Sequence, residues 1–174
     1  MQKKKVLFIL APKDFRDEEY FDTREVIEKK FVVHTSNISG KTSKSVFGKH
    51  VEVDFSMDKI DVNDYSALVF VGGQGCSVYF DEKKILDIAK ASYLKGKFVC
   101  AICLAAGIIS NAGIVSGKKI TGSYGAKDLV EAGGGKFKGK EIEVSGRVIT
   151  ASGPEASKKF GEAISDALSK NNEE

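Results

Sequence analysis

Short, nearly unbroken apolar runs alternate with longer amphipathic segments along most of the chain. Each apolar run is typical of a strand that is covered on both faces of its sheet. We expect such strands at 6–10, 31–35, 68–71 and 97–102, with a further short strand at 119–121 and a hairpin that joins 141–144 to 148–150. The segment 37–63 is less regular, and we expect a small excursion with one or two edge strands there.

Amphipathic segments between these runs predict helices. An acidic cluster at 14–19 opens the first, which ends at 29–30, and others are expected at 81–94, after Cys103 and at 126–132. The last begins at Gly153-Pro154-Glu155, where proline suits the first helical turn. Alternating strands and helices predict an α/β fold, a doubly wound, mostly parallel sheet with helices on both faces and a small hairpin excursion.

Composition favours one globular domain over residues 1–174. The chain has 42% hydrophobic residues and 27 basic against 24 acidic residues, a net charge of +3. The lysines are scattered among acids and glycines, so no nucleic-acid partner is expected. The longest apolar run near the start, 6–11, is too short for a membrane span. We therefore expect a soluble, cytoplasmic protein without a membrane partner.

The three cysteines do not indicate a disulfide framework or a metal centre. Cys100 and Cys103 have C-x-x-C spacing, but Cys100 is expected inside a strand, which argues against a dithiol pair. With only two histidines and no second C-x-x-C, a zinc site is not expected, and neither is a cofactor. Cys76 is expected to be an ordinary loop residue.

Cys103 is expected at a sharp turn between a strand and a helix. Such a turn needs small neighbours, and the residues two before and two after are Ala101 and Ala105. The first turn of a helix favours a thiolate over a thiol, so this position predicts a reactive nucleophile. The alternative is an inert cysteine buried in the core.

The carboxyl ends of parallel strands meet at one edge of such a sheet. The loops that follow Leu10, Val71 and Ile102 should therefore lie together. This places the acidic cluster and the glycine loop 72–75 beside Cys103. The glycines permit close backbone approach, either to a phosphate or to an oxyanion.

Five short motifs in this order resemble the ThiJ/PfpI superfamily, which includes the parkinsonism-associated deglycase and archaeal intracellular proteases on a flavodoxin-like fold. The motifs lie at 14–19, 72–73, 101–103, 126–129 and 149–154. The resemblance implies that Cys103 is the nucleophile and that Glu19 is the glutamate hydrogen-bonded to it. It also implies that Gly73 and Leu104 donate N–H groups to an oxyanion, and that the protein forms a homodimer or a larger assembly.

The expected role of Glu19 has a physical basis. A carboxyl that is packed beside a thiolate has its pKa raised by desolvation and by the like charge, so it can stay protonated and donate to sulfur. Asp17 and Glu18 are alternatives for this role, and a solvated acidic helix start is another interpretation of the cluster.

The sequence departs from the family pattern at three positions. Leu104 follows the cysteine where protease-like members have histidine, which argues against a cysteine peptidase. Ser123 and Ser152 stand where deglycase-type members often have histidine and arginine, and this loss of positive charge should weaken the binding of anionic substrates. Candidate substrate contacts are Gly72, Ser123 and Tyr124.

Three hypotheses follow. In the first, Cys103 attacks a small reactive carbonyl, in a glyoxalase-like or deglycase-like reaction. In the second, the protein is a redox sensor or protective protein whose Cys103 is oxidised to sulfinic acid. The third is a binding module with an inert cysteine.

Overall fold

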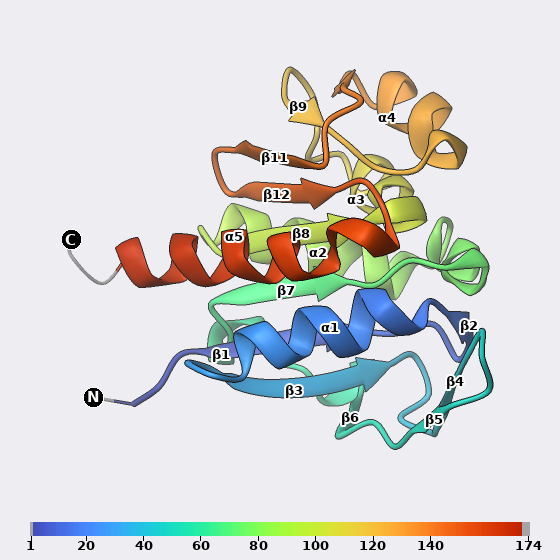
Figure 1. Cartoon of the computed structure of the whole chain (residues 1–174), viewed down its shortest axis with the longest axis vertical. Helices are drawn as coiled ribbons and strands as arrows, with labels where there is room; N and C mark the ends of the chain where they lie inside the picture. Colours follow the sequence, from blue (N-terminus) through green and yellow to red (C-terminus); the bar gives the residue numbers. More distant parts are fainter. Residues whose placement is uncertain (1, 172–174) are drawn as a thin grey trace.

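The computed structural model describes residues 2–171 and centres on a seven-stranded sheet (Figure 1). Its strands run in the order β11-β12-β8-β7-β1-β3-β6. They span β1 Lys5–Ile9, β3 Val32–Asn37, β6 Phe55–Ser56, β7 Ala67–Phe70, β8 Phe98–Ile102, β11 Ile142–Ser145 and β12 Val148–Ala151. Every neighbouring pair is parallel except β11 and β12, which form the expected hairpin.

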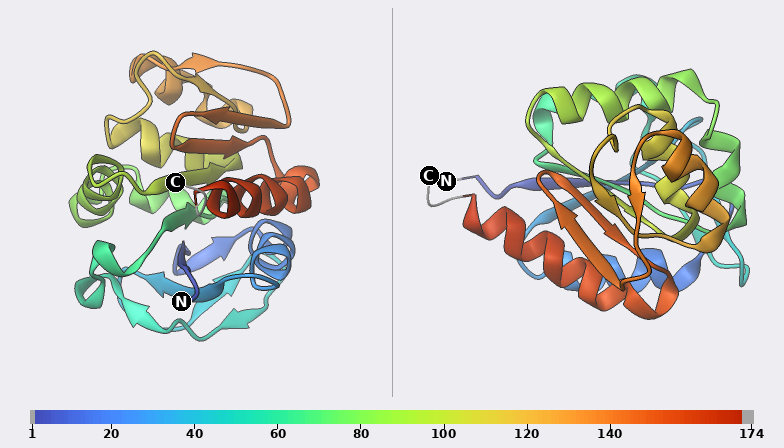
Figure 2. Two further views of the ribbon diagram at one scale, coloured as in Figure 1. Left: turned by 90° about the vertical axis from the view of Figure 1, so that its left-hand side faces the viewer. Right: turned by 90° about the horizontal axis from the view of Figure 1, so that it is seen from above.

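Helices cover both faces of the sheet, as Figure 2 shows for α1 and α5 on one face and α2 on the other. The helices are α1 Asp17–Ile27, α2 Lys83–Leu94, α3 Ala106–Asn111, α4 Lys127–Ala132 and α5 Ser157–Lys170. Two buried clusters fill the space between layers. Phe8, Tyr20 and Phe160 belong to the cluster under α1 and α5, and Phe70 and Ile109 belong to the cluster on the opposite face. This is the doubly wound α/β fold that the apolar runs predict.

The segment 37–63 contains more strands than expected. It holds β4 Ser43–Ser45, β5 His50–Val51 and β6. Strands β4 and β5 join β2 Lys13–Phe15 in a small separate sheet, while β6 is the edge of the main one. Asp14 therefore lies in β2 rather than in the first helix. A second small sheet pairs β9 Lys119–Ile120 with β10 Lys136–Phe137.

Short 3-10 helices of one or two turns complete the chain. They are η1 Met57–Lys59, η2 Val62–Asp64, η3 Gln74–Tyr79, η4 Cys103–Ala105, η5 Tyr124–Ala126 and η6 Pro154–Ala156. Among residues 2–171, no helix combines the length and the apolar character that crossing a membrane requires.

Candidate functional site

Cys103 lies at the turn where β8 ends and η4 begins. Its φ is 60°, a left-handed conformation that residues other than glycine seldom adopt. The flanking Ala101 and Ala105 are fully buried, which agrees with the need for small residues around this turn. Cys103 itself is partly exposed. Strained backbone of this kind is concentrated at functional sites, so the turn is a candidate site on its own geometry.

Glu19 is the acidic residue that meets Cys103. It lies in the first turns of α1, is fully buried, and accepts a hydrogen bond at Oε2 from the Gly72 N–H at 3.1 Å. Within residues 2–171 its Oε1 has no hydrogen-bond partner. The Cys103 thiol is the side chain with the largest effect on the pKa of the carboxyl.

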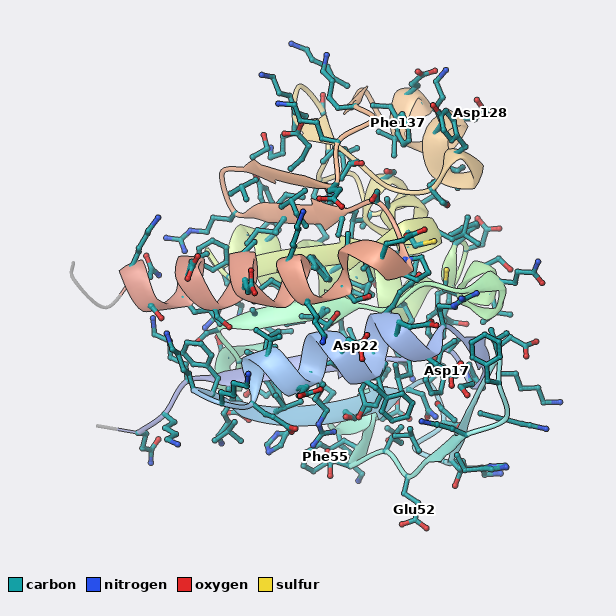
Figure 3. All side chains as sticks on the ribbon, viewed as in Figure 1. Asp17, Asp22, Glu52, Phe55, Asp128 and Phe137 are labelled. Carbon is teal, nitrogen blue, oxygen red and sulfur yellow. The ribbon has the colours of Figure 1, made fainter. Side chains whose placement is uncertain are left out.

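The other two acids of the cluster have different partners. Asp17 accepts from the Ser45 hydroxyl at 2.7 Å and from the Phe47 N–H at 3.1 Å, so it fixes the β4–β5 hairpin to the start of α1. Figure 3 shows Asp17 at the end of α1 that lies beside this hairpin. Glu18 pairs with Arg16 at 2.7 Å. Of the three candidates, the structure therefore brings only Glu19 to the sulfur.

Burial controls the ionisation of the Cys103–Glu19 pair. It raises the pKa of Glu19 to about 8, although the Cys103 thiol, the Gly72 N–H and the charge of Arg16 act in the opposite direction. Burial also raises the pKa of Cys103 to about 12, helped by the charge and hydrogen bond of Glu19 and opposed by Ser123 and the Leu104 N–H. The expectation of a lowered thiol pKa is wrong, because desolvation and Glu19 outweigh the helix start.

The two groups titrate together because two like charges in one buried site repel. At neutral pH the pair holds both protons. The carboxyl loses its proton first, near pH 8, while the Cys103 thiol keeps its own, so the singly ionised pair is a Glu19 carboxylate beside a neutral thiol. In this state the carboxylate can take the proton of the thiol as the sulfur reacts, and it can then return that proton as an acid.

The glycine loop after β7 shapes the site through its backbone. Gly73 has φ of 100°, and a Cβ there would come within 2.5 Å of the Asp14 carbonyl oxygen. Gly72 is buried, and a Cβ on it would lie 2.7 Å from Glu19 Oε2 and 3.0 Å from Cys103 Cβ. Gly72 is absent from the residues that line the cleft, so its observed contact is with Glu19. Gly73 lines the cleft, as an oxyanion donor must.

The other candidate residues lie on either side of Cys103. The Leu104 N–H and the Ser123 side chain both act on the Cys103 sulfur, and both residues line the cleft. Tyr124 is 82% exposed and lies farther out, against Phe137 with 5.9 Å between ring centroids. It lines a second cleft of about 480 Å³ that also reaches Cys103. Ser152 lines this second cleft as well.

The main cleft has a volume of about 520 Å³ and contains residues that sequence reasoning missed. The missed lining residues are Asp14, Arg16, Val46, Gln74 and Pro154. Asp14 and Arg16 belong to the motif at 14–19, which the sequence already places beside Cys103, so their position near the cleft was predictable. Val46 comes from the irregular segment 37–63, and no sequence pattern indicated that it lines the cleft. Arg16 supplies a positive charge, so the cleft keeps a cation although residues 123 and 152 are serines.

The remaining cysteines and the histidines take no part in the cleft. Cys76 and Cys100 are fully buried, and burial raises the pKa of each thiol. His34 contacts the Tyr65 hydroxyl at 2.9 Å, and His50 is an exposed residue of β5. Neither histidine lines the cleft, so the geometry of a Cys–His peptidase is absent from it. Within residues 2–171, no three His, Cys, Asp or Glu side chains gather closely enough to hold a metal ion.

Known relatives have similar sequences over most of their length. An uncharacterised protein of Methanocaldococcus jannaschii is 35% identical over 99% of this chain and 86% of its own. A deglycase of Pyrococcus horikoshii is 29% identical over 86% of this chain and 90% of its own. A glutathione-independent glyoxalase of Caenorhabditis elegans is 26% identical over 95% of this chain and 89% of its own.

Solved structures and a family model agree with these relatives. A ThiJ/PfpI domain protein from Brachyspira murdochii matches with a TM-score of 0.94 and 27% identity, over 97% of this chain and 99% of that one. The model of the DJ-1/PfpI family matches residues 4–167. From its sequence and its fold, the chain belongs to the DJ-1/PfpI family.

Proposed function

We propose that this protein is a cysteine-dependent enzyme that acts on small reactive carbonyl compounds, in a glyoxalase-like or deglycase-like reaction. The observation that carries the proposal is the pairing of Cys103, strained at a turn in a cleft, with a buried Glu19 carboxyl whose pKa is raised to about 8. Burial makes ionisation of this carboxyl costly in free energy, and a carboxyl with a purely structural role would not need such burial.

The chemistry begins with addition of sulfur to the carbonyl carbon. In the singly ionised pair, the Glu19 carboxylate takes the proton of the Cys103 thiol as the sulfur attacks and a new S–C bond forms. The π electrons of the carbonyl move to its oxygen, which the N–H groups of Gly73 and Leu104 stabilise. Glu19 then gives its proton to that oxygen. The addition is balanced without an oxidant or a reductant.

The names of relatives support this class of substrate. A protein of Pyrococcus horikoshii is named a deglycase and one of Caenorhabditis elegans a glyoxalase that is independent of glutathione. Both names describe chemistry on a carbonyl or its adduct. Because these two relatives are each under 30% identical to this chain, they support the class and leave the individual substrate to experiment.

Turnover of methylglyoxal tests the proposal. The intact protein should consume it, and Cys103→Ser should lose at least about 10³-fold of kcat/KM because a serine hydroxyl lacks the nucleophilicity of the pair. Cys100→Ser is the matched control, since Cys100 is buried three residues away and makes no contact with the cleft. Equal rates for the intact protein and Cys103→Ser would refute the proposal.

A redox role is the second candidate, and it rests on exposure. Cys103 is the only one of the three cysteines that is not fully buried, so peroxide reaches it first. We expect mild peroxide to add two oxygen atoms to Cys103 before it modifies Cys76 or Cys100, as measured by peptide mass spectrometry. Equal modification of all three cysteines, or none, would contradict this role.

A further inference from the structure

Arg16 brings a positive charge into the cleft that holds Cys103. Of the ten cleft-lining residues it is the only Lys, Arg or His. Its side chain is 35% exposed, so the guanidinium is accessible from the cleft. A cation that shares a small cleft with a nucleophile can select substrates by their charge.

Two neighbours hold the Arg16 side chain in place. Its Nε donates to Glu18 Oε2 at 2.7 Å, and its Nη2 lies 3.4 Å from Glu18 Oε1. The guanidinium carbon also lies 5.0 Å from the centre of the Phe47 ring. In the part of the chain that is described, Nη1 has no hydrogen-bond partner, so this nitrogen keeps its donors for a ligand. A guanidinium that is fixed beforehand loses little side-chain entropy when it binds a planar anion.

We propose that Arg16 is the specificity-determining residue of this cleft and binds a carboxylate that the carbonyl substrate carries. The proposal rests on the proposed function, because it assigns the substrate class of the same site: anionic carbonyl compounds in preference to neutral ones. Planar carboxylates match the donor geometry of guanidinium.

Asp14 is one of three carboxyls that oppose the charge of Arg16. The other two are Glu18, which pairs with Arg16, and Glu19, whose pKa is about 8. Asp14 is exposed and lines the same cleft, so it reduces the attraction of an anion. The proposal therefore makes two predictions of opposite sign. Loss of Arg16 should weaken the selection of anions, and loss of the Asp14 charge should strengthen it. Asp14→Asn suits the second test because asparagine tolerates the φ of 58° at this position.

The test compares two alkylating agents that differ only in charge. Iodoacetate is an anion and iodoacetamide is neutral, and both react with Cys103 at the same kind of carbon. We would measure the rate of each at about pH 9, where the Cys103–Glu19 pair has lost its first proton, by mass spectrometry of the Cys103 peptide. The ratio of the two rates cancels any change in the ionisation or accessibility of the thiol.

Arg16→Gln should lower the iodoacetate-to-iodoacetamide ratio about three- to tenfold relative to the intact protein, a range that allows for solvent screening. Arg16→Lys should recover part of the ratio, and Asp14→Asn should raise it. Arg147→Gln is the matched control. The Arg147 guanidinium also stacks on a phenylalanine, at 4.8 Å from the centre of the Phe98 ring, but Arg147 precedes β12 and so lies at the amino ends of the parallel strands, away from the cleft.

An unchanged ratio in Arg16→Gln, or an equal fall in Arg147→Gln, would overturn the assignment of Arg16. This outcome is distinct from failure of the proposed function. Alkylation requires only a reachable thiol, so a protein without methylglyoxal turnover could still show the effect of Arg16. Conversely, an active enzyme with an unchanged ratio would keep the proposed function and reject the anionic substrate class.

Discussion

The interior of β8 and its carboxyl end hold the same residue type in two different states. Cys100 pairs in register with Val69 and Ile149 and packs in the core under α1 and α5. Cys103 comes three residues later, after the strand has ended, with a strained backbone and a carboxyl beside its sulfur. Burial raises the pKa of both thiols, so a raised pKa by itself does not identify the functional one. The partner distinguishes them, because only Cys103 has an acid that can exchange a proton with it.

The largest effect should come from removing that partner. Glu19→Gln should lower methylglyoxal turnover by about 10²- to 10⁴-fold, the range typical of a lost general acid or base. Without Glu19, the sulfur has no neighbouring group to take its proton. Glu25→Gln, an exposed position on the same helix, is the matched control and should keep turnover within about twofold. Comparable losses in both variants would mean that α1 acts through stability alone.

Stability should depend on pH through the same carboxyl. The folded chain keeps Glu19 protonated up to about pH 8, whereas the ordinary pKa is 4.5. Because the folded state binds the extra proton, the free energy of unfolding should fall as pH rises from about 4.5 and the loss should be complete above pH 8. Over this range the intact protein should lose roughly 3–5 kcal/mol more than Glu19→Gln in denaturant titrations.

The Glu19→Gln amide changes the packing free energy by the same amount at every pH. Comparing how the free energy of unfolding changes with pH in the two proteins therefore cancels this packing term. Glu25→Gln should follow the intact protein. Parallel pH curves for the intact protein and Glu19→Gln would contradict a raised pKa for Glu19.

The two cysteines should separate stability from turnover. Cys100→Ser buries a hydroxyl in an apolar core and should cost about 1–3 kcal/mol of unfolding free energy while turnover persists. Cys103→Ser should cost less than about 1 kcal/mol, because the side chain is partly exposed, and should lose turnover. Thermal or denaturant unfolding beside the methylglyoxal assay measures both. The reverse pattern would remove the distinction drawn between the two positions.

A smaller effect is expected from crowding the pair. Gly72→Ala places a Cβ within 2.7 Å of Glu19 Oε2 and 3.0 Å of Cys103 Cβ, so the pair must shift. Turnover should fall about tenfold, because small displacements of reacting groups are costly. Gly139→Ala is the control, since a Cβ there meets nothing within 4 Å. A fully active Gly72→Ala variant would show that the spacing of the pair matters little.

The main sheet was predictable from sequence because its strands are continuous apolar runs. The 6–10 and 68–71 runs fall on β1 and β7 within one residue at each end. The strands that were missed, such as β2 and β10, have two or three residues, and such short strands depend on their tertiary neighbours rather than on local pattern. Asp17 helps to hold the β2–β4–β5 sheet in place through hydrogen bonds with Ser45 and Phe47. Both residues are about thirty positions from Asp17 in the sequence, so no local pattern indicates the contacts.

The sequence indicated that Cys103 and the acidic cluster would meet, but it did not indicate the electrostatics of the site. The small neighbours of Cys103 indicated the turn, and strand order indicated that the acidic cluster would reach it. The sign of the thiol pKa shift was wrong because desolvation depends on the packed structure, whereas the helix start is visible in the sequence. The motif at 14–19 indicated that Arg16 lies near the cleft, but the direction of its side chain was not predictable, because that direction depends on Glu18 and Phe47.

The most direct test of the coupled pair is the pH dependence of Cys103 alkylation by iodoacetamide, measured in the intact protein and in Glu19→Gln. In the intact protein the rate should rise through about pH 8, as the pair loses its first proton, and then level off below pH 10. In Glu19→Gln the step at pH 8 should vanish and a single rise should remain at higher pH. One identical, single-step curve in both proteins would contradict the pairing of Cys103 with Glu19.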